Sequence, residues 1–167
     1  MNPVRAGRIA ASIVAAVALI TAAAAPASAN VPLKIGTLNN INSGRCLEIA
    51  GWSTDAGATA NQWDCNGGAN QRWNMAAGQQ IFVNVNSGKC LEIADWRTDN
   101  GAPVRQWDCT GGDNQKWYLL PFGNSWGIGN LHSGKCVEIS GWRTDNGAPA
   151  RQWDCNGGAN QVWYMGN

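Results

Sequence analysis

The sequence contains a single histidine, His132, and none of its cysteines stand at Cys-x-x-Cys spacing. Zinc sites commonly use such cysteine pairs together with histidines, so we expect neither a metal site nor a cofactor. A Ser-His-Asp catalytic set is also disfavoured, because only one imidazole is available to act as its base. These features disfavour metal-dependent and triad-dependent enzymes.

An excess of charge is lacking as well. The chain has 12 basic and 11 acidic residues, a net charge of +1, and no run of like charges. Nucleic acids and anionic membranes attract proteins through basic surfaces, and a near-neutral net charge gives no electrostatic reason to expect either partner. We therefore expect no nucleic-acid partner.

Only one long hydrophobic run is present, and it lies at the N-terminus. Arg5 and Arg8 precede an alanine-rich stretch from about Ile9 to Ala25, and Ala27-Ser28-Ala29 follows it. A transmembrane anchor is the rival interpretation, but the run is short and ends in a small-residue cleavage pattern. We predict a signal peptide over residues 1–29 and a secreted, extracellular domain over 30–167. Loss of both arginines makes its net charge about −1, and we expect no membrane insertion after cleavage.

Six cysteines lie within a threefold internal repeat. The first cysteines of successive copies are 44 and 46 residues apart, and residues 87–118 and 133–164 match at 25 of 32 positions. Six cysteines in a secreted chain imply disulfides, and the repeat selects one of the fifteen possible connectivities. The predicted pairs are Cys46–Cys65, Cys90–Cys109 and Cys136–Cys155.

The local pattern within each copy is that of strands and turns, with no helical period in the mature chain. In the second copy, Ile81–Val85, Cys90–Ile93 and Val104–Cys109 read as strands, and Asn114–Tyr118 begins a fourth. Four strands in each of three copies give about twelve short strands. That number favours an all-β, closed or capped barrel.

The cysteine pair brings an acid near a tryptophan. If Cys90 lies opposite Cys109, the next cross-strand pair on that face is Glu92 and Trp107, although a staggered register remains open. An indole offers an apolar platform for a pyranose ring, and a carboxylate accepts hydrogen bonds from sugar hydroxyls. The corresponding pairs are Glu48 with Trp63 and Glu138 with Trp153.

Three copies of one motif set carry a family resemblance. The motifs are SGRCLEI with QWDCNGGANQRW, SGKCLEI with QWDCTGGDNQKW, and SGKCVEI with QWDCNGGANQVW. In these elements, over about residues 35–165, the sequence resembles the ricin B-chain-like lectins. The resemblance implies a single β-trefoil of three pseudo-threefold repeats, at about 35–75, 79–118 and 126–165, with one sugar pocket in each. The implied sugar-binding residues are Glu48, Trp63, Asn70, Gln71, Glu92, Arg105, Trp107, Asn114, Gln115, Glu138, Arg151, Trp153, Asn160 and Gln161.

The sequence departs from that family in two respects. All three copies have Glu where the family typically has Asp, which moves the carboxylate outward by about a bond length. The polar position two before the stacking tryptophan is Asn61 in the first copy but Arg105 and Arg151 in the others. Either arginine could contact the glycan or pair with the glutamate instead.

Other repeated residues have competing interpretations. Trp63, Trp107 and Trp153 are expected as partly exposed platforms, and the Gln of each Asn-Gln pair serves either the ligand or the backbone. The tryptophans that follow each acid by four residues either wall the pocket or pin the loop: Trp52, Trp96 and Trp142. Core positions are expected for Trp73, Trp117 and Trp163, and surface or turn positions for Asp64, Asp108 and Asp154.

The function favoured by these patterns is a secreted, non-catalytic lectin, acting as a monomer on a polysaccharide or glycan. Single shallow sites should bind with Kd near ~1 mM, and up to three sites would gain by avidity. A glycosidase needs two neighbouring carboxylates, and each expected pocket supplies one. A secreted protein-binding β-trefoil, such as an inhibitor or toxin component, is the alternative.

Overall fold

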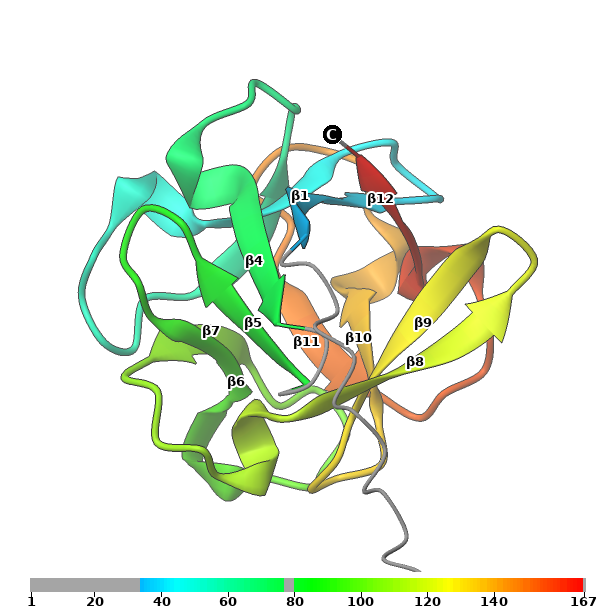
Figure 1. Ribbon diagram of the computed structural model, residues 1–167. Helices are drawn as coiled ribbons and strands as arrows, with labels where there is room; N and C mark the ends of the chain where they lie inside the picture. The colour runs from blue at the N-terminus through cyan, green and yellow to red at the C-terminus, as the bar shows by residue number, and fades with distance from the viewer. Residues whose placement is uncertain (1–33, 77–79, 167) are drawn as a thin grey trace, which may run out of the picture.

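The computed structural model describes residues 34–76 and 80–166, and the predicted signal peptide lies outside these ranges (Figure 1). Within them the regular structure is β-strands and single 3₁₀ turns, and no helix has the length and apolarity needed to cross a membrane. The strands are β1 (Lys34–Asn40), β2 (Cys46–Ile49), β3 (Ala60–Trp63), β4 (Arg72–Ala76), β5 (Ile81–Asn84), β6 (Cys90–Ile93), β7 (Val104–Trp107), β8 (Trp117–Phe122), β9 (Ser125–Asn130), β10 (Cys136–Ile139), β11 (Ala150–Trp153) and β12 (Val162–Gly166). The expectation of an all-β fold with about twelve short strands is confirmed.

Six strands form a barrel-like ring. Antiparallel ladders join β4 to β5, β1 to β4, β12 to β1, β9 to β12 and β8 to β9. In the described part of the chain β5 and β8 share no ladder. Instead, the backbone N–H of Trp117 donates to the carbonyl of Gln80 at 2.7 Å and brings the two strand ends together.

The remaining six strands form three hairpins: β2–β3, β6–β7 and β10–β11. Single bridges link each hairpin to the next in a cycle and close on the first: Thr59↔Arg105, Pro103↔Arg151 and Asn61↔Pro149. The three copies of the repeat therefore pack around a common pseudo-threefold axis (Figure 1). This arrangement places the candidate site of each copy beside a loop of another copy.

The core is built from the same positions in each copy. Alternation along β2, β6 and β10 buries two aliphatic residues per hairpin at 0% exposure: Leu47, Ile49, Leu91, Ile93, Val137 and Ile139. One tryptophan per copy fills the space between hairpin and ring, and its indole N–H donates to a strand carbonyl at 3.0–3.1 Å. The expected core positions are thus confirmed for Trp73, Trp117 and Trp163.

The disulfides form as predicted, but the hairpin register is the staggered one. Cys90 lies opposite Trp107, and Glu92 lies opposite Arg105. The disulfide closes because the chain turns back after β7, which brings the Cα of Cys109 to 5.1 Å from that of Cys90. The direct Glu92–Trp107 pairing expected from the sequence is therefore wrong. A shift of two residues keeps both side chains on one face, so the acid and indole are diagonal neighbours.

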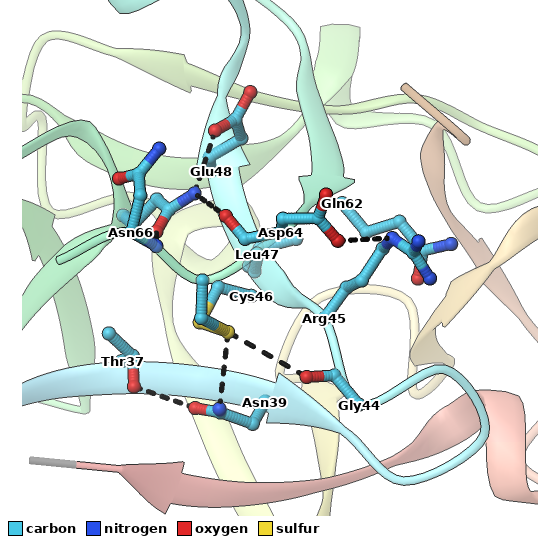
Figure 2. Close-up of a disulfide and its surroundings, with 12 residues drawn as sticks. Thr37, Asn39, Gly44, Arg45, Cys46, Leu47, Glu48, Gln62, Asp64 and Asn66 are labelled. Atoms are coloured by element: carbon cyan, nitrogen blue, oxygen red, sulfur yellow. Dashed lines mark hydrogen bonds and ion pairs between the residues drawn. A yellow bond between two sulfur atoms is a disulfide. The ribbon is translucent and has the colours of Figure 1, made fainter. Parts of the chain in front are cut away.

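The same correction holds in the other copies, where Glu48 lies opposite Asn61 and Glu138 opposite Arg151. Figure 2 shows the first disulfide, with the amide of Asn39 3.4 Å from the sulfur of Cys65. The strand predicted over Val104–Cys109 ends at Trp107, and the Asn-Gln pairs lie in 3₁₀ turns rather than in strands. Each turn follows a Gly-Gly pair and directs both amides back toward the hairpin.

Candidate functional site

Each copy buries its glutamate and fixes one carboxylate oxygen. Glu48, Glu92 and Glu138 are only 3–7% exposed, although a buried carboxylate is costly unless hydrogen bonds compensate it. Oε2 of each acid accepts one bond from the neighbouring Asn and one from the neighbouring Gln, at 3.0–3.3 Å. Oε1 of Glu48 and of Glu138 receives no hydrogen bond from the described residues. These two oxygens are free acceptors.

The amides that were expected to contact a ligand are engaged by the protein itself. Gln71 donates both Nε2 hydrogens, to Glu48 and to the carbonyl of Asp64, and its Oε1 accepts from the N–H of Asn66. The same bonds recur at Gln115 and Gln161. Of the two roles open from the sequence, the structure thus gives the glutamines the structural one.

The asparagines also serve the acid. Asn70 donates to Glu48 and to the carbonyl of Ile49, both at 3.2 Å. Its Oδ1 is buried without a hydrogen bond in the described structure, as are those of Asn114 and Asn160. Leaving such an atom unpaired costs about 1–3 kcal/mol. In all three copies the amide nitrogen of the asparagine instead donates to the glutamate and to a backbone carbonyl of the same strand.

The three platform tryptophans are half-exposed, as predicted. Trp63, Trp107 and Trp153 expose 37–42% of their surface. Each is backed by a glycine from another copy: a Cβ on Gly57 would lie 3.4 Å from Trp107, one on Gly101 4.0 Å from Trp153, and one on Gly147 3.8 Å from Trp63. All three glycines have a positive φ of 80–90°, which favours glycine.

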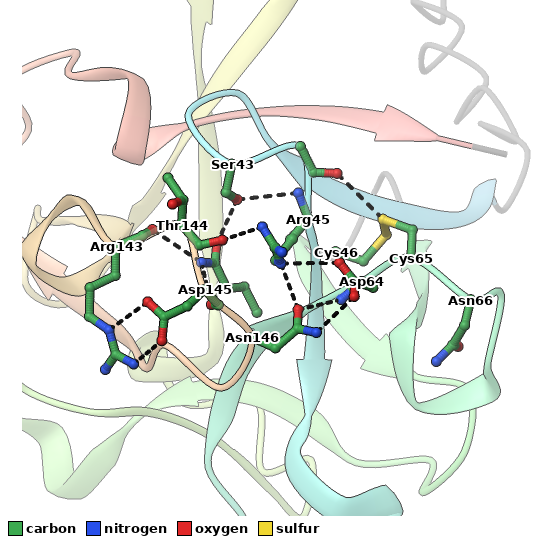
Figure 3. A network of polar contacts seen from close by, with 12 residues as sticks. Ser43, Arg45, Cys46, Asp64, Cys65, Asn66, Arg143, Thr144, Asp145 and Asn146 are labelled. Atoms are coloured by element: carbon green, nitrogen blue, oxygen red, sulfur yellow. Dashed lines mark hydrogen bonds and ion pairs between the residues drawn. A yellow bond between two sulfur atoms is a disulfide. The ribbon is translucent and has the colours of Figure 1, made fainter.

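Loops from neighbouring copies hold these platforms in place. The N–H of Gly147 donates to the carbonyl of Gln62 at 2.8 Å, and the buried amide of Gln62 donates to the carbonyls of Arg143 and Asp145. Figure 3 shows the surrounding network, in which Asn146 bonds to Asp64 and Arg45. Loop 97–102 holds Gln152 and Asp154 in the same way, and loop 53–58 holds Gln106.

Replacing Gly101 with alanine should perturb the site of the third copy rather than its own. A φ of +85° strains any alanine, so we expect the free energy of unfolding to fall by about 1 kcal/mol. The new methyl group would also contact Trp153. Indole N–H signals in ¹⁵N–¹H NMR spectra should therefore shift for Trp153. Gly88→Ala is the matched control, because its φ is +69° but no atom lies within 4 Å of the added carbon. A shift of Trp107 in place of Trp153 would contradict this linkage between copies.

The tryptophans that follow the glutamate by four residues line the pockets of the second and third copies. A cavity of about 410 Å³ in the third copy is lined by Glu138, Ser140, Gly141, Trp142, Trp153, Asn156 and Asn160. A smaller one of about 210 Å³ in the second is lined by Glu92, Asp95, Trp96, Arg105, Trp107, Thr110 and Asn114. Trp96 and Trp142 thus wall a pocket. Trp52 packs in the same manner as these two against its Gly-Gly turn.

The two cavities differ in their charges. In the second copy Arg105 pairs with Glu92 at 2.8 Å and with Asp95 at 3.0 Å. In the third copy Arg151 instead donates to the carbonyl of Gly101 at 2.9 Å. Burial raises the pKa of the Glu138 carboxyl, an effect that its amide partners partly offset. The sequence left open whether each arginine pairs with its glutamate. Arg105 does so in the second copy, and Arg151 does not in the third.

Two further sequence expectations can be compared with this geometry. Asp64, Asp108 and Asp154 lie at the surface as predicted, each in an ion pair with Arg45, Lys89 or Lys135. The expectation of one acid per pocket is wrong for the second copy, where Asp95 is a second carboxylate. The signal was present in the sequence, because Asp95 stands where the other copies have Gly51 and Gly141.

Comparison with known proteins places this geometry among related folds. The family model described as the ricin-type beta-trefoil lectin domain matches residues 34–163. The designed three-fold symmetric protein ThreeFoil is 34% identical with a TM-score of 0.77, over 80% of this chain and 98% of ThreeFoil. An exo-β-1,3-galactanase from Clostridium thermocellum is 33% identical with a TM-score of 0.74, over 78% of this chain but 29% of the galactanase. A ricin B-like lectin of Macrolepiota procera, solved with lactose, shares the fold at 18% identity and a TM-score of 0.70, over 80% of this chain and 95% of the lectin. The predicted β-trefoil is confirmed.

Proposed function

The chain belongs to the ricin-type β-trefoil lectin domain family, and from that membership we propose that it is a secreted, non-catalytic carbohydrate-binding protein. It binds sugars weakly at individual sites and acts by avidity on a polysaccharide or multivalent glycan. Secretion rests on the N-terminal sequence pattern of residues 1–29.

One observation carries the proposal: a free carboxylate acceptor beside an exposed indole in an open cavity. In the third copy, Glu138 lines the same cavity as Trp142 and Trp153, and its Oε1 accepts no hydrogen bond from the described residues. A pyranose can lay its C–H face on the indole while two hydroxyls donate to the carboxylate. The Asn-Gln amides fix the acid in advance, so little side-chain freedom is lost when sugar binds.

The expected affinity of one such site is modest. A single shallow contact of this kind corresponds to Kd near ~1 mM. Several sites on one rigid domain engage a repeating polysaccharide together, and avidity then strengthens retention by about a hundredfold or more. We propose that the protein is not catalytic because glycoside hydrolysis needs two neighbouring carboxylates. Among the described residues, Glu138 is the only acidic residue that lines the third cavity.

Retention on immobilised polysaccharide tests the proposal. The similar structures include an exo-β-1,3-galactanase and a lectin solved with lactose, so β-1,3-galactan and lactose are the first probes, within a wider glycan array. The purified domain should be retained on at least one glycan, and the free sugar should release it. Retention on protein ligands that no sugar competes away would favour the protein-binding alternative, and release of reducing ends by the pure domain would reverse the assignment as non-catalytic.

A further inference from the structure

Two nearly identical sites place the same arginine differently. Each arginine lies opposite its glutamate in the hairpin ladder, Arg105 opposite Glu92 and Arg151 opposite Glu138. Arg105 turns into its cavity, where Nε donates to Oε1 of Glu92 and the guanidinium carbon lies 4.6 Å from the ring centroid of Trp107. Arg151 lies outside the lining of its cavity and bonds to the Gly101 carbonyl.

The availability of a backbone acceptor does not explain the difference. Loop 53–58 meets Gln106 through the same hydrogen bonds that loop 97–102 makes with Gln152. The carbonyl of Gly57 is therefore presented to Arg105 much as that of Gly101 is to Arg151. The other lining differences are uncharged: Asn156 replaces Thr110, which bonds to Gln115, and Ser140 lines the third cavity at the position of Ala94. None of these side chains carries a negative charge that would draw the guanidinium into the cavity.

Asp95 is the charged difference between the two cavities. It lies three residues after Glu92, and its Oδ1 accepts from Nη2 of Arg105 at 3.0 Å. Its backbone has φ 55° and ψ 29°, close to 65° and 25° at Gly141 and 62° and 23° at Gly51. Glycine adopts this left-handed conformation without steric strain, and aspartate adopts it only at some cost. The second copy thus carries a carboxylate at a position where the backbone favours glycine.

We propose that Asp95 determines the specificity of the second site, by holding Arg105 between two carboxylates and over Trp107. The guanidinium occupies Oε1 of Glu92, the oxygen that is a free acceptor in the other copies, and it covers the ring on which a sugar would stack. The remaining cavity has about half the volume of that in the third copy. Neutral sugars are therefore excluded from the second site.

The first site should remain open for the opposite reason. It has Asn61 in place of the arginine and Gly51 in place of the aspartate, so neither half of the ion pair exists. The unmodified chain then has two sites for neutral sugars, in the first and third copies. This inference rests on the proposed function, because it concerns which of the sites takes sugar.

Reciprocal exchange of the distinguishing residue tests the inference. Lactose is titrated into the ¹⁵N-labelled domain while the indole N–H signals of Trp63, Trp107 and Trp153 are followed. In the unmodified chain Trp63 and Trp153 should respond, and Trp107 should respond at least about tenfold more weakly. Asp95→Gly should bring Trp107 to within about threefold of Trp153. Gly141→Asp should silence Trp153, because the new carboxylate draws Arg151 over it. Thermal unfolding confirms that each variant is folded.

The outcomes separate this inference from the proposed function. Equal responses of Trp107 and Trp153 in the unmodified chain, or no gain at Trp107 in Asp95→Gly, would overturn the role of Asp95 while leaving sugar binding in place. If no glycan of the array shifts the indole N–H signals of Trp63, Trp107 or Trp153, both proposals are overturned. If Asp95→Gly gains a lactose response at Trp107 and Gly141→Asp loses the response at Trp153, both proposals are supported.

Discussion

Replacing Trp63 and Trp153 together with alanine should abolish retention on the polysaccharide that the unmodified domain binds. Both indoles are about 42% exposed and stand beside a glutamate with a free oxygen. Each truncation removes the stacking surface of one site, and the loss of multivalency multiplies the two effects. We expect retention to weaken by at least about a hundredfold, measured by affinity electrophoresis or surface plasmon resonance.

Single replacements give this experiment its internal controls. Trp107→Ala should change retention by less than about twofold, because Arg105 already covers that ring. Tyr164→Ala removes an aromatic side chain of similar exposure, 38%, that lines neither described cavity. Near-UV circular dichroism verifies that each variant is folded. If the Trp63/Trp153 double variant is retained as well as the unmodified domain, these tryptophans do not contribute to sugar binding.

Reduction of the three disulfides should unfold the domain. Each bridge closes a loop with a sequence separation of 19, for which chain entropy gives about 3 kcal/mol of stabilisation. Three such contributions sum to about 9 kcal/mol, which is comparable to the whole stability of a small domain. The second cysteine of each pair is exposed, so a reductant can reach every bridge; these residues are Cys65, Cys109 and Cys155.

Urea denaturation measures the effect. The reduced and alkylated chain should lack a cooperative transition, whereas Cys136→Ala combined with Cys155→Ala should keep one with a free energy of unfolding lower by about 3 kcal/mol. Neither the alkylation nor the double substitution replaces the aliphatic residues that β2, β6 and β10 bury. A reduced chain that unfolds within about 2 kcal/mol of the oxidised one would show that the bridges are incidental to stability.

Repetition in the sequence explains why so much of the fold was predictable. Three in-phase cysteine pairs selected one connectivity, and the tryptophans of the Gln-x-Trp elements marked the core, where Trp73, Trp117 and Trp163 lie. Alternation in CLEI and CVEI placed the aliphatic residues inward. The acid and the platform tryptophan were also placed on one face correctly, because a stagger of two residues preserves the face of every side chain.

The register of the hairpins and the ion pairs of the sites needed the structure. Pairing Cys90 with Cys109 does not show that the chain turns after Trp107, so the direct partner of Glu92 was misassigned. The support of Trp153 by Gly101 depends on contacts between copies, which no local pattern reveals. Arg105 and Arg151 also have different hydrogen-bond partners, which we attribute to Asp95, a residue whose counterparts are Gly51 and Gly141.

A crystal structure of the unmodified domain soaked with lactose would show where the sugar binds. We expect a pyranose ring stacked on Trp153, with hydroxyl oxygens about 3 Å from Oε1 of Glu138, and a matching ring at Trp63 and Glu48. Lactose bound elsewhere on the domain, with Trp153 and Glu138 left free, would contradict it.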